Sequence, residues 1–186
     1  LFNTEMVRAI MDGRKTVTRR VIRLPKRGYW DNDPPRGVMP RYRIGDILYV
    51  RETFMEHHTY FIKNNLDNPT ILYKADYLGD EDLMNCGIDR WKPSIHMPKK
   101  YARILLEVTD VRVERLQDIT INGIYHEGAI GRYLWERPNL QEMYKGLAYT
   151  AWINLWNSAI NKNEIALYGW DANPYVFVYD FRKVKV

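Results

Sequence analysis

The sequence predicts an α+β protein in which a small, closed or nearly closed β-barrel is flanked by helices. Several short segments alternate apolar and polar residues, as strands do, and three segments have the 3.6-residue period of helices. A barrel suits so many short strands because closing a sheet removes its exposed edges. No repeat, low-complexity tract or linker divides the 186 residues, so we expect a single domain spanning residues 1–186.

The first predicted elements are a helix over residues 4–12 and a strand over residues 16–22. Asn3 or Thr4 can cap the helix, and Gly13 suits the position just after a helix end, where the backbone often turns left-handed. The segment "TVTRRVI" then alternates as a strand does. The apolar stripe of the helix is formed by Met6, Val7, Ile10 and Met11.

Short strands joined by loops are expected in the middle of the chain. Residues 23–40 contain turn-forming residues and a pair of prolines, which cannot lie inside a ladder, so they are predicted to be a loop. The clearest strand patterns cover residues 42–54 and 101–116, with shorter ones at 59–63 and 70–77. In the segment 42–54 the residues expected on one face are Ile47, Tyr49 and Arg51, and those on the other are Leu48, Val50 and Glu52.

The last third of the chain predicts two helices and a closing strand. Residues 118–129 read as a helix capped at Asp118 or Thr120, and residues 140–160 as a long helix. Residues 175–186 close the chain as a strand. The apolar residues expected along the long helix are Met143, Leu147, Ala151, Ile153, Leu155 and Trp156, and Trp152 and Trp156 are expected in the core.

Composition excludes some classes of protein. A hydrophobic content of 46%, with six Trp and fourteen Tyr, argues against disorder, and no apolar run approaches the roughly 20 residues that span a bilayer. Cys86 is the only cysteine, so an internal disulfide is impossible and a cytoplasmic location is expected. Because the chain begins at Leu1 without Met, we expect N-terminal residues to be missing, and a removed signal peptide stays an alternative.

Positive charge is concentrated near the N-terminus. Residues 1–52 contain 12 Lys/Arg and 6 Asp/Glu, whereas the rest of the chain carries a net charge of −1. This asymmetry favours a polyanion or a phosphate-bearing ligand, with a solvated basic face as the alternative.

The sequence offers no sign of a metal or cofactor site. His57, His58, His96, His126 and Cys86 lack the spacing of metal ligands. No glycine-rich nucleotide loop is present, and the cysteine has no histidine nearby in the sequence, so neither a cofactor nor a catalytic thiol is expected. Trp91, Trp135 and Trp170 lie in polar or Pro-containing segments, which suits either partial burial or the stacking of a base.

The segment "DGRKTVTRR", residues 12–20, carries the most chemistry. Lys15 and Thr18 are three residues apart, and a regular strand would place them on opposite faces, so they meet only if a turn or bulge intervenes. A desolvated Lys15 could then take the proton of the Thr18 hydroxyl. Glu127 in "YHEGA" is the candidate acid/base.

At these residues the chain resembles the ASCH-domain family, whose fold is the PUA-like β-barrel. The family pattern of a short helix followed by G-x-K-x-x-x-x-R is matched by Gly13, Lys15 and Arg20. The segments "IGDILYVRET", "LLEVTDVRVERLQDITINGIYHEGA" and "YVFVYDFRKV" match further pieces in the family order. The resemblance spans nearly the whole chain, leaving inserted loops near residues 24–41 and 78–98, and the larger size resembles members carried by bacteriophages and prophages.

The resemblance implies two functions. One is RNA binding, by analogy with PUA domains; the other is the amidohydrolase activity of some small members, which remove an acyl group from N4-acylated cytidine. The Lys, Thr and Glu of those enzymes correspond to Lys15, Thr18 and Glu127, although the longer loops of this chain could reshape the site. We therefore expect a nucleoside amidohydrolase or, alternatively, a non-catalytic RNA- or DNA-binding module; a phage-encoded regulator with a host protein partner is a third class. The residues expected to bind substrate or nucleic acid are Arg14, Arg19, Arg20, Arg51, Trp91, His96 and Trp170.

Overall fold

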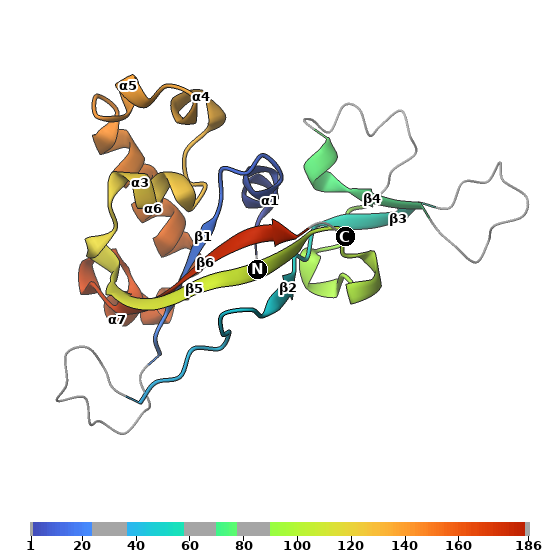
Figure 1. Cartoon of the computed structure of the whole chain (residues 1–186), viewed down its shortest axis with the longest axis horizontal. Coiled ribbons are helices and arrows are strands. Elements are labelled where there is room, and N and C mark those ends of the chain that lie inside the picture. The colour runs from blue at the N-terminus through green and yellow to red at the C-terminus, as the bar shows by residue number, and fades with distance from the viewer. Residues whose placement is uncertain (1, 24–36, 58–69, 78–89, 185–186) are drawn as a thin grey trace, which may run out of the picture.

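The computed structural model describes residues 2–23, 37–57, 70–77 and 90–184, and it combines helices with antiparallel sheet (Figure 1). Its strands are β1 (Val17–Val21), β2 (Ile47–Tyr49), β3 (Phe54–His57), β4 (Thr70–Tyr73), β5 (Leu105–Arg115) and β6 (Tyr175–Val184). Its helices are α1 (Thr4–Met11), α3 (Ile121–His126), α4 (Arg132–Trp135), α5 (Pro138–Gln141), α6 (Lys145–Ala159) and α7 (Ile165–Tyr168). The expected strand at 59–63 and most of both expected insertions lie outside the described residues.

The main sheet is a curled antiparallel half-barrel with the strand order β1-β6-β5-β2. β3 and β4 form a separate two-stranded ribbon beyond one end of this sheet (Figure 1). The α+β class is thus confirmed, but within the described strands the sheet does not close, and β1 and β2 are its edges. The physical reason lies in the segment 42–54, which pairs in the main sheet over three residues only and then turns away to form β3.

β6 is buried on both faces, and its pairing with β1 determines which side chains of β1 lie on each face of the sheet. Val176 and Val178 pack against the helices, whereas Phe177 and Tyr179 pack on the opposite face. In the β1–β6 register Thr18 lies opposite Tyr179, and residues directly opposite each other share a face. Thr18 therefore lies on the face opposite to α3 and α6, where α1 packs against Phe181, and its neighbours along β1 lie on the face of α3 and α6, here called the helical face.

The first helix confirms its sequence signals. The Asn3 side chain accepts a hydrogen bond from Met6 N at 2.8 Å, and α1 ends before Gly13, whose φ of +77° is the left-handed conformation that glycine adopts without strain. α3 is capped by Thr120, which accepts from Gly123 N at 3.1 Å.

The predicted long helix over residues 140–160 is wrong in its first turn. The chain makes α5, a turn, and then α6 from Lys145, so that Met143 and Leu147 are exposed. The buried face of α6 is formed instead by Ala148, Trp152 and Trp156, which recur every four residues, and the two tryptophans lie in the core as expected. Within the described residues, no helix has the length and apolar character that crossing a bilayer requires.

Candidate functional site

A buried ion pair between Lys15 and Glu127 lies at the outer edge of β1. Lys15 Nζ is 2.8 Å from Glu127 Oε2, and the two side chains are 0% and 3% exposed. The same ammonium donates to the Glu127 carbonyl and to the Val17 carbonyl, each at 2.7 Å. The structure thus brings together two of the three residues predicted to be catalytic, although they are 112 positions apart in the chain.

The turn after α1 delivers Lys15 to this position. Lys15 N donates to the Ala9 carbonyl and Thr16 N to the His126 carbonyl, so residues 15 and 16 join α1 to the end of α3 before the strand begins. Gly128 allows the close approach: its φ is +72°, and a Cβ there would lie 2.9 Å from Ala9 Cβ and 3.1 Å from Lys15 Cβ.

The ammonium of Lys15 is held in a desolvated setting. Burial lowers the pKa of Lys15 below its ordinary value, because removing water penalises the charged form. Glu127 opposes this lowering, whereas the charges of Arg20 and Arg19 add to it. All three protons of the ammonium have an acceptor, so the lysine must give up one hydrogen bond before it can act as a base.

Thr18 is adjacent to the pair but is not bonded to it. The Val17 carbonyl that accepts from Lys15 Nζ belongs to the peptide that links Val17 to Thr18. Thr18 itself is buried, and within the described part of the chain no hydrogen bond joins its hydroxyl to Lys15 or Glu127. The turn before β1 therefore brings Lys15 Nζ to the Val17–Thr18 peptide, and its three hydrogen bonds go to Val17 and Glu127.

Most of the positive charge in residues 12–20 is neutralised by carboxylates. Arg14 Nη2 lies 3.1 Å from Asp12 Oδ2, while its Nη1 donates to the Ile130 carbonyl. Arg19 is buried between Glu114, at 3.0 Å, and Glu127, at 3.3 Å. The basic segment is thus largely an internal charge network rather than an exposed phosphate-binding patch.

Arg20 differs from its neighbours in this segment. Its side chain is exposed, its Nη1 donates to the Arg19 carbonyl, and no carboxylate of the described residues forms an ion pair with it. Its guanidinium lies over the ring of Phe2, 5.7 Å from the centroid, and Lys15 Nζ is 5.4 Å from the same centroid. Phe2 is therefore the aromatic residue at this site, and the sequence patterns gave no signal for it.

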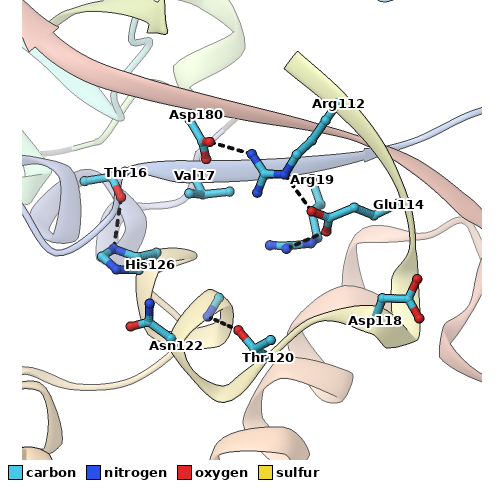
Figure 2. Close-up of a pocket in the computed structure, with 11 residues that line it drawn as sticks. Thr16, Val17, Arg19, Arg112, Glu114, Asp118, Thr120, Asn122, His126 and Asp180 are labelled. Carbon is cyan, nitrogen blue, oxygen red and sulfur yellow. Dashed lines mark hydrogen bonds and ion pairs between the residues drawn. The ribbon is translucent and has the colours of Figure 1, made fainter. Parts of the chain in front are cut away.

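A pocket of about 440 Å³ opens on the helical face of β1 (Figure 2). The His126 Nδ1 and Thr16 Oγ1 atoms are 3.0 Å apart at one side of it, and Arg112 and Asp180 lie at another. Glu114 lies between Arg19 and Arg112. Lys15, Thr18 and Glu127 do not line this pocket, and among its lining residues Arg19 is the one whose side chain forms an ion pair with Glu127.

The other residues expected to bind a ligand lie elsewhere. Arg51 donates to the Ile95 carbonyl and the Tyr49 hydroxyl, and His96 is exposed in the adjacent turn. The Trp91 ring lies 5.9 Å from that of Tyr77. Trp170 packs against the helical core, 6.5 Å from the Tyr149 ring. The structure therefore does not bring these four side chains to the Lys15–Glu127 pair.

Two charged residues of the site, Arg112 and Glu114, were missed by the sequence argument. They are two apart on β5 and therefore share a face, so the charged "VRVER" repeat was the available signal. In the described residues, no group of His, Cys, Asp and Glu could hold a metal ion, and Cys86 lies outside those residues.

Comparisons of this chain with protein-family models, with curated proteins and with solved structures found no match.

Proposed function

We propose that the chain is a nucleoside-recognising amidohydrolase of the PUA-like, ASCH type, which removes an acyl group from an N4-acylated cytidine. The observation that carries the proposal is the buried Lys15–Glu127 pair beside the Thr18 peptide. The resemblance of the surrounding motifs to the ASCH family supports it. A lysine whose pKa is lowered by burial, next to a carboxylate and a hydroxyl, has the three groups that acyl transfer to a hydroxyl needs.

The first half of the reaction starts with a proton shift inside the pair. The Lys15 ammonium gives a proton to Glu127 across 2.8 Å, which leaves a neutral amine and a carboxylic acid. The amine takes the proton of the Thr18 hydroxyl as the oxygen adds to the acyl carbonyl. Glu127 protonates the exocyclic nitrogen as the C–N bond breaks, so cytidine leaves and the acyl group stays on Thr18.

The second half restores the enzyme. The Glu127 carboxylate takes a proton from water as the water oxygen adds to the acyl-threonine. The Thr18 oxygen leaves with a proton from the Lys15 ammonium, and the carboxylic acid is released. Glu127 then returns its proton to Lys15, so the resting ion pair is restored. The exposed Arg20 and the Phe2 ring adjoin Lys15 and would hold the nucleoside.

The test is acetate release from N4-acetylcytidine between about pH 6 and 9, where general acid–base groups of this kind operate. Wild-type protein should release acetate, and Thr18→Val, which replaces the hydroxyl by a methyl group of similar size, should not. Arg182→Gln, which alters an exposed ion pair with Glu107, is the matched control and should retain activity. No release by folded wild-type protein at any pH in this range contradicts the proposal for this substrate.

A non-catalytic nucleic-acid-binding module is the second candidate. It is favoured by one observation: every proton of the Lys15 ammonium already has an acceptor, as in a purely structural ion pair. This candidate predicts an affinity for RNA or DNA that falls steeply with salt, because phosphate contacts release counterions. Binding of an oligonucleotide that weakens with salt, without any hydrolysis, would favour it. A protein partner, as for a phage-encoded regulator, would instead be retained after nuclease treatment.

A further inference from the structure

Arg19 is the only residue of the pocket lining that has an ion pair with Glu127 in the described part of the chain. Its side chain is 4% exposed, its Nη1 is 3.3 Å from Glu127 Oε1, and Lys15 holds the other oxygen, Oε2. The carboxylate is therefore gripped at both oxygens by two different cations. Such a carboxylate has little freedom to rotate, because rotation about its last bond breaks both contacts.

Besides Glu127, the Arg19 guanidinium binds a second carboxylate, that of Glu114. Its Nη2 lies 3.0 Å from Glu114 Oε2, and the other oxygen of Glu114 accepts from Arg112 Nε at 2.6 Å. Gly123 of α3 lies beside the guanidinium: a Cβ there would be in ordinary contact with Arg19 Nη2, at 3.4 Å. Among the described residues the buried Arg19 Nε atom has no hydrogen-bond partner, and the contacts of the guanidinium there are with its two carboxylates.

These contacts form a continuous series of alternating charges. It runs from Lys15 through Glu127, Arg19 and Glu114 to Arg112, whose guanidinium also pairs with Asp110 and Asp180. Figure 2 shows the part of the series from Arg19 to Asp180. The inner end of the series is buried and the outer end meets solvent. Among the described contacts, Arg19 is the residue that links the outer end of the series to Glu127.

We infer that Arg19 is a positioning residue, which restrains the Glu127 carboxylate by holding Oε1 and couples the Lys15–Glu127 pair to the charges of the pocket. This inference builds on the proposed function, because it assigns how the acid/base of that site is held. It also changes the role expected for Arg19 from phosphate binding to internal alignment. The charged groups that face Lys15 are Glu127, Arg19 and Arg20, and those that face Arg19 are Glu127 and Glu114.

Removing the charge of Arg19 and removing the charge of its partner Glu114 should shift the pKa of Lys15 in opposite directions. Arg19→Gln removes a cation that repels Lys15, while Lys15 keeps its own contact with Glu127 Oε2, so the pKa of Lys15 should rise. Glu114→Gln removes an anion and leaves the Arg19 charge less compensated, so the pKa of Lys15 should fall. Damage to the fold would expose Lys15 in both variants and would move its pKa in the same direction in both.

The experiment follows the titration of Lys15 by NMR of protein with labelled lysine side chains, using Lys15→Met to assign the signal. The expected result is an upward shift in Arg19→Gln, a downward shift in Glu114→Gln and no shift in the exposed control Arg182→Gln. Shifts in the same direction, or no shift in either variant, would overturn the inference. If Arg19→Gln does not fold, the test rests on Glu114→Gln. A Lys15 pKa that is unchanged or raised in Glu114→Gln then overturns the inference.

This readout needs no substrate, so it separates the inference from the proposed function. If wild-type protein hydrolyses N4-acetylcytidine, Arg19→Gln should also lower kcat/KM by about 10²-fold, the cost of a misplaced catalytic group. Opposite NMR shifts without hydrolysis by wild-type protein would leave the positioning role standing and refute the hydrolase. Hydrolysis with kcat/KM unchanged in Arg19→Gln would overturn the positioning role.

Discussion

In the described part of the chain two carboxylates are almost fully buried, and their partners are different. Glu127 is shared between Lys15 and Arg19, one oxygen each. Glu52, near the β3–β4 ribbon, is 1% exposed and accepts two hydrogen bonds from Arg103, at 3.0 and 2.8 Å. Arg103 also binds Asp76 through two nitrogens and lies 3.9 Å from the ring centroid of Tyr73.

The difference between these two centres lies in whether the cation can release a proton. Despite partial desolvation, its two carboxylates raise the pKa of Arg103, so its charge is permanent and the two-pronged contact serves to hold chain segments together. Burial lowers the pKa of Lys15, and Thr18 lies beside it. A buried carboxylate therefore does not by itself indicate a reactive site; the proposed function rests on a buried carboxylate that is paired with a lysine beside a hydroxyl.

The largest effect is expected from Lys15→Met. This change leaves Glu127 with one cation and no base beside Thr18, so hydrolysis of N4-acetylcytidine should fall by about 10²- to 10⁴-fold. Breaking a buried pair on one side should also lower the free energy of unfolding by about 3–5 kcal/mol, measured by urea denaturation. Lys15→Met/Glu127→Gln removes both charges and should recover much of the stability and none of the activity. Retained hydrolysis in folded Lys15→Met would place this centre in the same structural class as Glu52.

Arg103→Met tests the other centre. It leaves Glu52 buried without its main partner, so the free energy of unfolding should fall by about 3–5 kcal/mol in urea denaturation. Because Arg103 contacts none of the proposed reacting groups, kcat/KM per folded molecule should stay at the wild-type value. A loss of kcat/KM at temperatures where the variant is folded would contradict the division between the two centres.

The smallest effect is expected in the pH dependence of stability. Lys15 binds a proton less readily in the folded protein, so between its folded pKa and the ordinary value of 10.5 the unfolded chain holds more protons. In that window the Lys15 contribution makes the free energy of unfolding rise with pH. Measured below about pH 10, before Tyr179 with its raised pKa introduces the opposite dependence, the wild type should show this rise relative to Lys15→Met. Equal slopes would show that the folded protein does not change the affinity of Lys15 for its proton.

Much of the local structure followed from local signals. The Asn3 cap, the end of α1 before Gly13 and the long strand β5 were predictable, because capping and two-residue alternation involve neighbours in the chain. The break before α6 was not, since apolar residues at Met143 and Leu147 fit a helical stripe although tertiary packing leaves both exposed. How far the sheet closes depends on the residue at which the segment 42–54 turns out of the main sheet. No local sequence pattern encodes that residue.

The sequence by itself determined the chemical groups of the candidate site, because "GRKTVTRR" and "HEG" carry the lysine, the threonine and the glutamate. Only the tertiary structure decided which arginines are exposed to solvent. Arg19 is enclosed by Glu114 and Glu127, whereas Arg20, the next residue, is exposed. The alternation of β1 separates these two side chains to opposite faces, and the register with β6 decides which face meets the helices. Charge neutralisation depends on partners about 100 residues away in the chain, so it becomes visible only when the strands and α3 are packed together.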